Sequence, residues 1–401
     1  MTPMNVELAP TAVPGFRFAG VSAGFKTTLG APDLGLIVAD RPATAAAAFT
    51  ANSVKAAPVL ISAERIKTGR LQVIAANSGC ANSFTGAAGM KLARESCAHL
   101  AKLIGCESAL VAPCSTGVIG HLYSLEKFQA GAEAAVRELR EDRMGDFARA
   151  IMTTDTRPKV AHTTLSAGGA KITIAGAAKG VGMISPKMAT MFAFLITDAA
   201  IAPATLRRSL KAALPRTFNA ITVDGDMSTN DTVIFMAGGA AKNRSLSARE
   251  QTAFDHAAEE IAATLARELV ADGEGATKLV TIDVRGARTA IDAERVARQV
   301  ANSPLVKTAF FGHDPNVGRI LMAAGASGAH VVPERLTLWI GGVKVAGRGA
   351  LIADALPEAA SRMREREFTV RLDLGVGKAS SSILTCDLSY EYVRINAEYT
   401  T

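Results

Sequence analysis

Short apolar segments rich in β-branched residues alternate along this chain with longer alanine-rich segments whose apolar residues recur at helical spacing. The first kind is typical of buried strands and the second of amphipathic helices. LQVIAANSG (71–79) predicts a strand, residues 86–105 predict a helix, and ALVAPCSTG (109–117) predicts a second strand. This alternation predicts a mixed α/β fold of the α+β type.

Gly168 and Gly169 separate two strand-like segments, a pattern that predicts a β-hairpin. The apolar run TMFAFLITDA follows the hairpin and predicts a buried strand. Residues 247–269 predict a long amphipathic helix, with Ser247 as its N-cap and Glu250 at the position that completes a capping box. Helical and strand-like segments therefore continue beyond the middle of the chain.

The chain has 401 residues, of which 49% are apolar, and this is enough to build two or three domains. We expect an N-terminal α/β core over residues 1–200 and a smaller C-terminal α/β domain over residues 281–401. Residues 201–280 are expected to complete the core, with helices over 203–214 and 247–269 flanking strands around ITVDGD and TVIFMAG.

The formal net charge is +7, yet Lys and Arg are scattered among Asp and Glu, and only one Trp and four Tyr are available to stack on bases. This argues against a nucleic-acid partner and favours small anionic substrates such as carboxylates. The N-terminus lacks the pattern of a secretion signal, and no apolar run reaches membrane-spanning length. The five cysteines lack CxxC spacing, and the six histidines form no helical ligand pair. We therefore expect a cytoplasmic protein with no membrane partner and no metal site.

Three short motifs are better explained without a catalytic role. GVSAG around Ser22 matches a nucleophile-elbow pattern, but too little chain precedes it to form the sheet beneath such a turn. GVGKASS lacks the first glycine and the hydroxyl residue of a phosphate-binding loop. Three acids could suggest a cation site, but no spaced Glu completes a calcium loop, so turn-forming acids are the simpler interpretation: Asp224, Asp226 and Asp231.

Two further segments favour a catalytic role. PCSTGVIG (113–120) places small residues after an apolar strand, where backbone N–H groups and a hydroxyl are able to bind an oxyanion, although a tight structural turn explains the same pattern. KGVGMISPKMATM (179–191) leads Thr190 into a buried strand. A β-branched side chain suits a strand, but we favour the alternative that Thr190 is a nucleophile.

Eight segments, in the same order, resemble the ornithine acetyltransferase family, the self-cleaving ArgJ-type glutamate N-acetyltransferases of arginine biosynthesis. They are NSGCANSFTG, STGVIG, IMTTDTRPK, KGVGMISPKMATM, ITVDGDMSTNDTV, GEGATK, GHDPNVGRI and NAEYTT. The resemblance extends over most of the chain. It implies a layered DmpA/ArgJ-like fold, with helices packed on central β-sheets, and acetyl transfer from N-acetylornithine to glutamate.

The resemblance also implies self-cleavage between Ala189 and Thr190, which gives chains 1–189 and 190–401 and a dimer of such αβ protomers. Thr116 and Gly117 would form the oxyanion hole. The substrate contacts it implies are Thr153, Lys179, Thr190, Glu274, Asn396 and Thr401. No tightly bound cofactor is expected, and acetyl-CoA is expected as a second acetyl donor, a property in which members differ. Three residues depart from the form expected for the family and put substrate preference in question: Cys80, His313 and Val317.

A threonine hydroxyl is a weak nucleophile until a base removes its proton. Cleavage before Thr190 would free its α-amino group, whose pKa of about 7.7 to 8.0 suits it as that base. Lys179 would pair with the α-carboxylate of each amino acid, and Glu274 with the donor's ammonium group. Two alternatives stay open at this point: a self-processing aminopeptidase or amidase that passes the acyl group to water, and a non-catalytic binding protein on the same fold.

Overall fold

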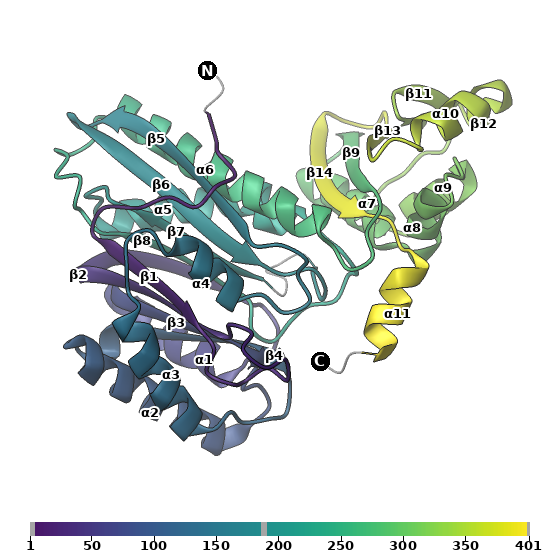
Figure 1. The fold of residues 1–401 in the computed structure, drawn as a ribbon. Helices are drawn as coiled ribbons and strands as arrows, with labels where there is room; N and C mark the ends of the chain where they lie inside the picture. Colours follow the sequence, from purple (N-terminus) through teal and green to yellow (C-terminus); the bar gives the residue numbers. More distant parts are fainter. Residues whose placement is uncertain (1–4, 186–190, 399–401) are drawn as a thin grey trace. The chain divides into compact units, whose positions relative to one another are not determined.

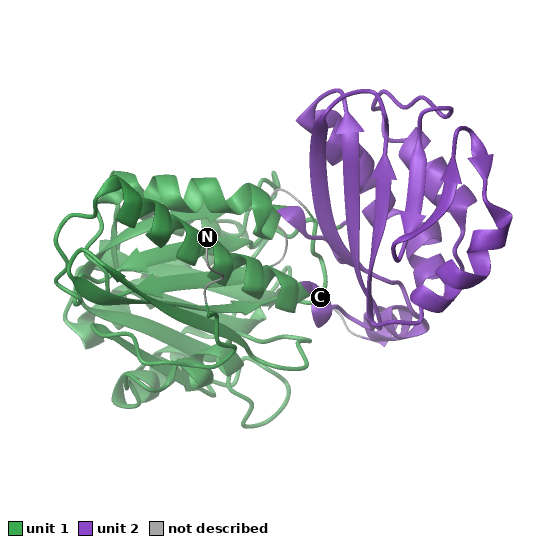
Figure 2. Ribbon diagram, turned by 90° about the horizontal axis from the view of Figure 1, so that it is seen from above, with its two compact units in different colours: residues 1–219, 226–269, 401 green, residues 220–225, 270–400 purple. Residues whose placement is uncertain are grey.

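The computed structural model describes residues 5–185 and 191–398 of the chain. These residues form two compact units, which are coloured separately in Figure 2. The first unit contains the described residues up to Asn219 together with Asp226–Leu269, and the second contains Ala220–Gly225 and the described residues from Val270 onward. Each unit has its own sheet and its own apolar core.

The first unit is built on an eight-stranded sheet in the order β4-β3-β2-β8-β7-β6-β5, with β1 paired to β2. The pairs β3–β4 and β7–β8 are parallel, and the other neighbouring strands are antiparallel. The strands are β1 (Phe16–Val21), β2 (Leu34–Phe49), β3 (Arg70–Cys80), β4 (Val111–Val118), β5 (Lys159–Ala167), β6 (Ala170–Lys179), β7 (Phe192–Thr197) and β8 (Thr232–Ala237).

The 16-residue strand β2 joins the two halves of this sheet. Its first part pairs with β1 and β3, and beyond an irregularity between Val38 and Ala43 its second part pairs with β8 as well. One apolar cluster contains Ile37 and Ile74 from the β1–β4 half and Phe194 from β7. The sheet therefore folds over on itself, and its two halves enclose a common core.

Helices cover the outer faces of this folded sheet (Figure 1), except α4, whose Met144 and Phe147 lie in the common core. Leu100 of α2 and Phe128 of α3 pack in the apolar cluster on the β1–β3 half. On the other half, Phe254 of α6 stacks on Phe235 of β8, with ring centres 6.1 Å apart. The helices are α1 (Ala57–Arg65), α2 (Gly86–Ile104), α3 (Leu125–Arg137), α4 (Met144–Ala150), α5 (Pro203–Ala213) and α6 (Ala248–Ala271), with 3₁₀ turns η1 (Ile66–Thr68), η2 (Ser108–Leu110), η3 (Leu214–Arg216) and η4 (Phe218–Ala220).

The second unit has a six-stranded sheet in the order β12-β11-β10-β13-β9-β14, in which β9 and β13 are parallel and the other neighbours antiparallel. Val296 of α7 and Ile320 of α9 share its core with Ile282 of β9. The strands are β9 (Leu279–Ala287), β10 (Thr337–Ile340), β11 (Val343–Gly347), β12 (Ala350–Leu351), β13 (Glu367–Asp373) and β14 (Ala379–Cys386). The helices are α7 (Ala290–Asn302), α8 (Pro304–Phe311), α9 (Val317–Gly325), α10 (Leu356–Arg362) and α11 (Tyr390–Glu398), with the 3₁₀ turn η5 (Ala353–Ala355).

The fold class expected from the sequence is confirmed, because both units combine helices with a sheet. The predicted capping box is present: Glu250 N donates to Ser247 Oγ at 3.4 Å, and Ser247 N donates to Glu250 Oε2 at 2.8 Å.

The expectation of a strand around ITVDGD is wrong. Ile221 makes an isolated bridge to Leu384, and Gly225, with a φ of +84°, turns the chain soon afterwards. Within the described ranges, no helix combines the length and the apolar character needed to span a membrane.

Candidate active site

Strand pairing in the first unit brings the end of β6 and the starts of β7 and β8 to one edge of the sheet. Lys179, the last residue of β6, pairs with Phe192, the first residue of β7. Phe192 pairs in turn with Thr232, the first residue of β8. Met191 precedes Phe192 at this edge, and the residue before it in the sequence is the predicted nucleophile Thr190, which lies outside the described residues.

Lys179 is buried at this edge, with 2% of its surface exposed. Its Nζ atom donates to Thr153 Oγ1 at 3.3 Å and lies 5.6 Å from the centre of the Phe192 ring. Loss of hydration lowers the pKa of Lys179 to about 8, an effect that two nearby carboxylates oppose and two nearby lysines reinforce. The structure therefore brings together two residues that were predicted as substrate contacts, Thr153 and Lys179.

Asp155 organises the surroundings of Lys179, and the sequence reasoning missed it. Its Oδ1 atom lies 2.6 Å from Lys159 Nζ, and both side chains are wholly buried. Asp155 also accepts the N–H of Gly180 at 2.9 Å and that of Thr153 at 3.0 Å. Burial alone would raise the pKa of Asp155, but Lys159, Lys179 and the Gly180 amide outweigh it and hold the pKa below its usual value. An acid four residues before a lysine, inside the TDTRPK segment, was the available signal.

Asp231 was interpreted as a turn-forming acid, and this is wrong because its side chain is fully buried beside the start of β8. Its Oδ1 atom accepts the N–H of Met191 at 3.1 Å. Burial raises the pKa of Asp231 well above its usual range, against the opposing effects of the Met191 amide, the Thr50 hydroxyl and Lys179. No group of three or more His, Cys, Asp or Glu side chains able to hold a metal ion occurs among the described residues.

The predicted oxyanion-hole residues lie near the end of β4, within the strand predicted over 109–117. Thr116 is buried in β4, whose pairing with β3 is irregular near Gly79. Gly117 has a φ of +125°, and a Cβ atom there would lie 2.4 Å from the carbonyl carbon of Gly79. Only glycine fits this position without moving the backbone.

Asn230 connects this strand to the edge that holds Met191. Its Nδ2 atom donates to the carbonyl oxygen of Ser115 at 2.6 Å and to that of Ala81 at 2.7 Å. Ser115 immediately precedes Thr116, while Asp231, the next residue after Asn230, holds Met191. Two adjacent side chains therefore hold β4 and the residue before β7. Sequence reasoning found neither of them.

In the second unit, Asn396 Nδ2 donates to Glu274 Oε2 at 2.7 Å. Asn396 belongs to α11 and also donates to the carbonyl oxygen of Tyr392 at 3.0 Å. The structure thus pairs two further predicted substrate contacts and places Asn396 on a helix. The remaining predicted site residues lie outside the described part of the chain: Ala189, Thr190 and Thr401.

A family model described as the ArgJ family matches residues 17–401 of the chain. The chain belongs to the ArgJ family. Among its curated relatives, the arginine biosynthesis bifunctional protein ArgJ of Geobacter sulfurreducens is 49% identical over 392 residues, covering 97% of this chain and 100% of that protein. The ArgJ protein of Desulfotalea psychrophila is 45% identical over 390 residues, 96% of this chain and 99% of its own length. The resemblance inferred from the sequence segments is confirmed.

Two solved structures are also similar to this ArgJ-family chain. The Bacillus halodurans ArgJ structure is 39% identical with a TM-score of 0.49, and it covers 52% of this chain and 98% of its own. The structure of the ornithine acetyltransferase of Mycobacterium tuberculosis complexed with ornithine is 36% identical with a TM-score of 0.42, covering 46% of this chain and 98% of that one.

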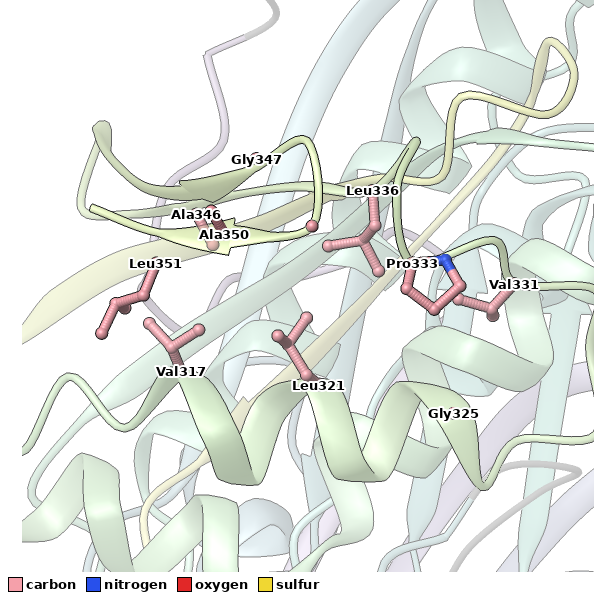
Figure 3. Close-up of a pocket in the computed structure, with 11 residues that line it drawn as sticks. Val317, Leu321, Gly325, Val331, Pro333, Leu336, Ala346, Gly347, Ala350 and Leu351 are labelled. Carbon is pink, nitrogen blue, oxygen red and sulfur yellow. The ribbon is translucent and has the colours of Figure 1, made fainter. Parts of the chain in front are cut away.

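The second unit also contains an apolar cavity of about 200 Å³ between α9 and the β11–β12 hairpin (Figure 3). Val317, one of the residues that depart from the expected family form, lines it together with Leu321 and Leu351. Its lining residues are all aliphatic, glycine or proline, so the cavity offers no group for catalysis.

Proposed function

We propose that this ArgJ-family chain is a self-cleaving acetyltransferase that moves an acetyl group from N-acetylornithine to glutamate. The observation that carries the proposal is the convergence of Lys179, Thr153 and Met191 at one sheet edge, in a chain that matches the family from residue 17 to 401. A buried lysine with a hydroxyl partner suits a substrate carboxylate, and Met191 is the next residue in the sequence after the proposed nucleophile Thr190.

Self-cleavage prepares the nucleophile. The Thr190 hydroxyl attacks the carbonyl carbon of Ala189, the acyl group moves from nitrogen to oxygen, and water hydrolyses the resulting ester. The products are chains 1–189 and 190–401. The freed α-amine of Thr190, with a pKa of about 7.7 to 8.0, then takes the hydroxyl proton during transfer.

Acetyl transfer proceeds through an acetyl-Thr190 ester in two half-reactions. Thr116 and Gly117 stabilise the charge that develops on the acetyl oxygen, and donors of this kind typically lower the barrier by about 2.7 to 4 kcal/mol each. Ornithine leaves after the first half-reaction. Glutamate enters, and its amine takes the acetyl group.

The site recognises two groups of the substrate, its α-carboxylate and the side-chain ammonium of the acetyl donor. Lys179, beside Thr153, pairs with the α-carboxylate that ornithine and glutamate share. Its pKa of about 8 keeps most of it protonated at neutral pH. Glu274, which accepts a hydrogen bond from Asn396, binds the ammonium group of the acetyl donor's side chain. Thr401 also contributes to recognition of this side chain. Acetyl-CoA serves as a second acetyl donor to glutamate, no cofactor is held tightly, and the working assembly is a cytoplasmic dimer of αβ protomers.

Mass spectrometry of the purified protein, with and without N-acetylornithine, tests this proposal. We expect two chains that separate at Ala189 and Thr190, and an acetyl group on the 190–401 chain after incubation with the donor. A Thr190→Ala variant should remain one chain of 41.6 kDa and take up no acetyl group. An uncleaved wild-type chain would contradict the proposal, as would release of acetate in place of N-acetylglutamate when glutamate is present.

A further inference from the structure

Asp155 holds the segment around Lys179 at two points. Its Oδ1 atom accepts the N–H of Gly180, the residue after Lys179, at 2.9 Å. Its Oδ2 atom accepts the N–H of Thr153 at 3.0 Å, and the hydroxyl of Thr153 accepts from Lys179 Nζ at 3.3 Å. One carboxylate therefore fixes both the backbone that carries the lysine and the hydroxyl that its ammonium group contacts.

Asp155 keeps its negative charge although its side chain is wholly buried. Lys159 Nζ donates to Asp155 Oδ1 at 2.6 Å, so the carboxylate accepts hydrogen bonds from an ammonium group and from two backbone amides. Burial alone would raise the pKa of Asp155, but the nearby lysines and the Gly180 amide hold this pKa below its usual value. The carboxyl group is therefore ionised at neutral pH.

Asp155 is also the main charge that favours the ammonium form of Lys179. Burial lowers the pKa of Lys179 to about 8, and Asp155 opposes this effect more strongly than Asp231 does. Two lysines act in the same direction as burial: Lys159 at the start of β5, and Lys26 in the segment between β1 and β2. Without Asp155, the balance of charges around this buried ammonium group would shift towards loss of its proton.

We propose that Asp155 is a positioning residue for substrate binding, which keeps the Lys179 ammonium group charged and fixed for the α-carboxylate that N-acetylornithine and glutamate share. The inference rests on the role of Lys179 proposed above. Asp155 acts through Lys179 and Thr153, and its loss should have two separable effects. Lys179 should release its proton at a lower pH, and its ammonium group, where it remains, should bind the carboxylate less well.

The test replaces the buried ion pair as a unit, because Asp155→Asn alone would take the carboxylate away from the buried Lys159. The double variant Asp155→Asn/Lys159→Met keeps a side-chain oxygen that accepts a backbone N–H. NMR of the full protein, labelled with carbon-13 at the lysine ε-carbon, follows the protonation of Lys179 with pH, and the signal that Lys179→Met lacks identifies it. We expect the midpoint of this titration to fall by about one pH unit, as the loss of a nearby opposite charge requires.

Lys159→Met alone should shift the midpoint in the opposite direction. It removes a cation that disfavours the Lys179 ammonium group and leaves Asp155 in place, so we expect the midpoint to rise. A purely structural role for the pair predicts no such relation between the sign of the shift and the charge removed. Shifts of the same sign in both variants, or no shift in either, would overturn the inference.

Asp198→Asn is the matched control. Asp198 is also buried and accepts a backbone N–H, that of Thr173 on the same strand as Lys179, at 2.8 Å. This variant removes a buried carboxylate from the other end of the strand, and the Lys179 midpoint should stay at its wild-type value. A midpoint that falls as far in Asp198→Asn as in the double variant would show that the effect is not specific to Asp155.

Steady-state KM values for N-acetylornithine and glutamate connect protonation to binding. In the wild type both should rise above pH 8, as Lys179 loses its proton. In the double variant the rise should begin about one pH unit lower. At pH 6, where Lys179 stays charged, we expect both KM values to be about 10-fold above the wild type, because the ammonium group is less well placed.

The two measurements distinguish failure of this inference from failure of the proposed function. An unshifted NMR midpoint, or KM values at pH 6 equal to those of the wild type, contradicts the role of Asp155 alone. Wild-type KM values that stay constant through the NMR midpoint of Lys179 contradict the proposed role of Lys179 in binding the α-carboxylate.

Discussion

The side-chain amide of Asn230 donates to the carbonyl oxygen of Ser115 at 2.6 Å, across 115 positions of sequence. This bond fixes the strand in which Thr116 and Gly117 follow, and a second bond from the same nitrogen holds Ala81. The position of the predicted oxyanion hole therefore depends on a residue at the entrance to β8.

Asn230→Ala should reduce both turnover and stability. Loss of the amide removes two hydrogen bonds to the carbonyl oxygens of buried residues, each worth about 1 kcal/mol, and it releases the strand that carries Thr116. A displacement of about 1 Å in such a site costs on the order of 100-fold in rate. We expect kcat for acetyl transfer to fall by about that factor, with a smaller change in KM, as measured in steady-state assays.

Asn243 provides the matched control for Asn230. It is also buried and donates to two carbonyl oxygens, those of Ala200 at 3.2 Å and Arg244 at 3.0 Å. Asn243→Ala should lose comparable stability and retain wild-type kcat. Equal kcat values in the two variants would show that Asn230 acts on stability alone.

Replacing Lys179 should stabilise the protein at neutral pH. The pKa of Lys179 is about 8 in the folded state, compared with 10.5 for a free side chain. Below pH 8 both states hold the proton, and the full cost of the buried ammonium is present. Between pH 8 and 10.5 the unfolded state binds more protons than the folded state, so the free energy of unfolding rises with pH. Lys179→Met should be more stable at pH 7 by on the order of 3 kcal/mol, and this advantage should shrink towards pH 10.5.

Denaturant titrations at pH 7 and pH 10 measure the effect. Lys171→Met is the control, because Lys171 lies on the same strand and is exposed. It should show no difference from the wild type at either pH. An advantage for Lys179→Met that stays constant with pH would contradict the assigned pKa.

The hydrogen bond between Asn396 and Glu274 should affect binding of the acetyl donor, N-acetylornithine, more than binding of the acetyl acceptor, glutamate. Asn396→Ala leaves Glu274 in place but removes the side-chain amide, whose hydrogen bond of 2.7 Å orients the Glu274 carboxylate. A hydrogen bond to a charged group is worth about 1.5 to 3 kcal/mol. We expect KM for N-acetylornithine to rise about 10-fold, with little change in KM for glutamate.

Val393→Ala provides the control for α11, because Val393 lies on the same helix with its side chain exposed. Its KM values should equal those of the wild type. If Asn396→Ala raises both KM values equally, the Asn396–Glu274 pair does not distinguish the acetyl donor from glutamate.

Deletion of residues 396–401 should abolish turnover in a folded protein, and full activity after deletion would exclude any role for this end of the chain.

Local patterns predicted the elements well. The 3.6-residue and alternating periodicities located β3, α2 and β4, and the Ser247–Glu250 spacing located the start of α6. Asn230 and Asp231 could not be found in this way. Their importance comes from tertiary contacts: β8 lies beside β7, which brings Asp231 to Met191, and Asn230 bonds to Ser115 of β4. From the local sequence alone, a turn-forming acid was the reasonable interpretation of Asp231.

The sequence by itself determined the mixed fold, the family and most of the residues that we propose for the reaction, because periodicity and motifs are properties of neighbouring residues. Only the tertiary structure decided that Thr153 meets Lys179, that Glu274 meets Asn396, and that Asp231 lies buried against Met191. A buried polar group takes its partners and its pKa from whatever the fold places around it, and strands far apart in sequence supply those surroundings.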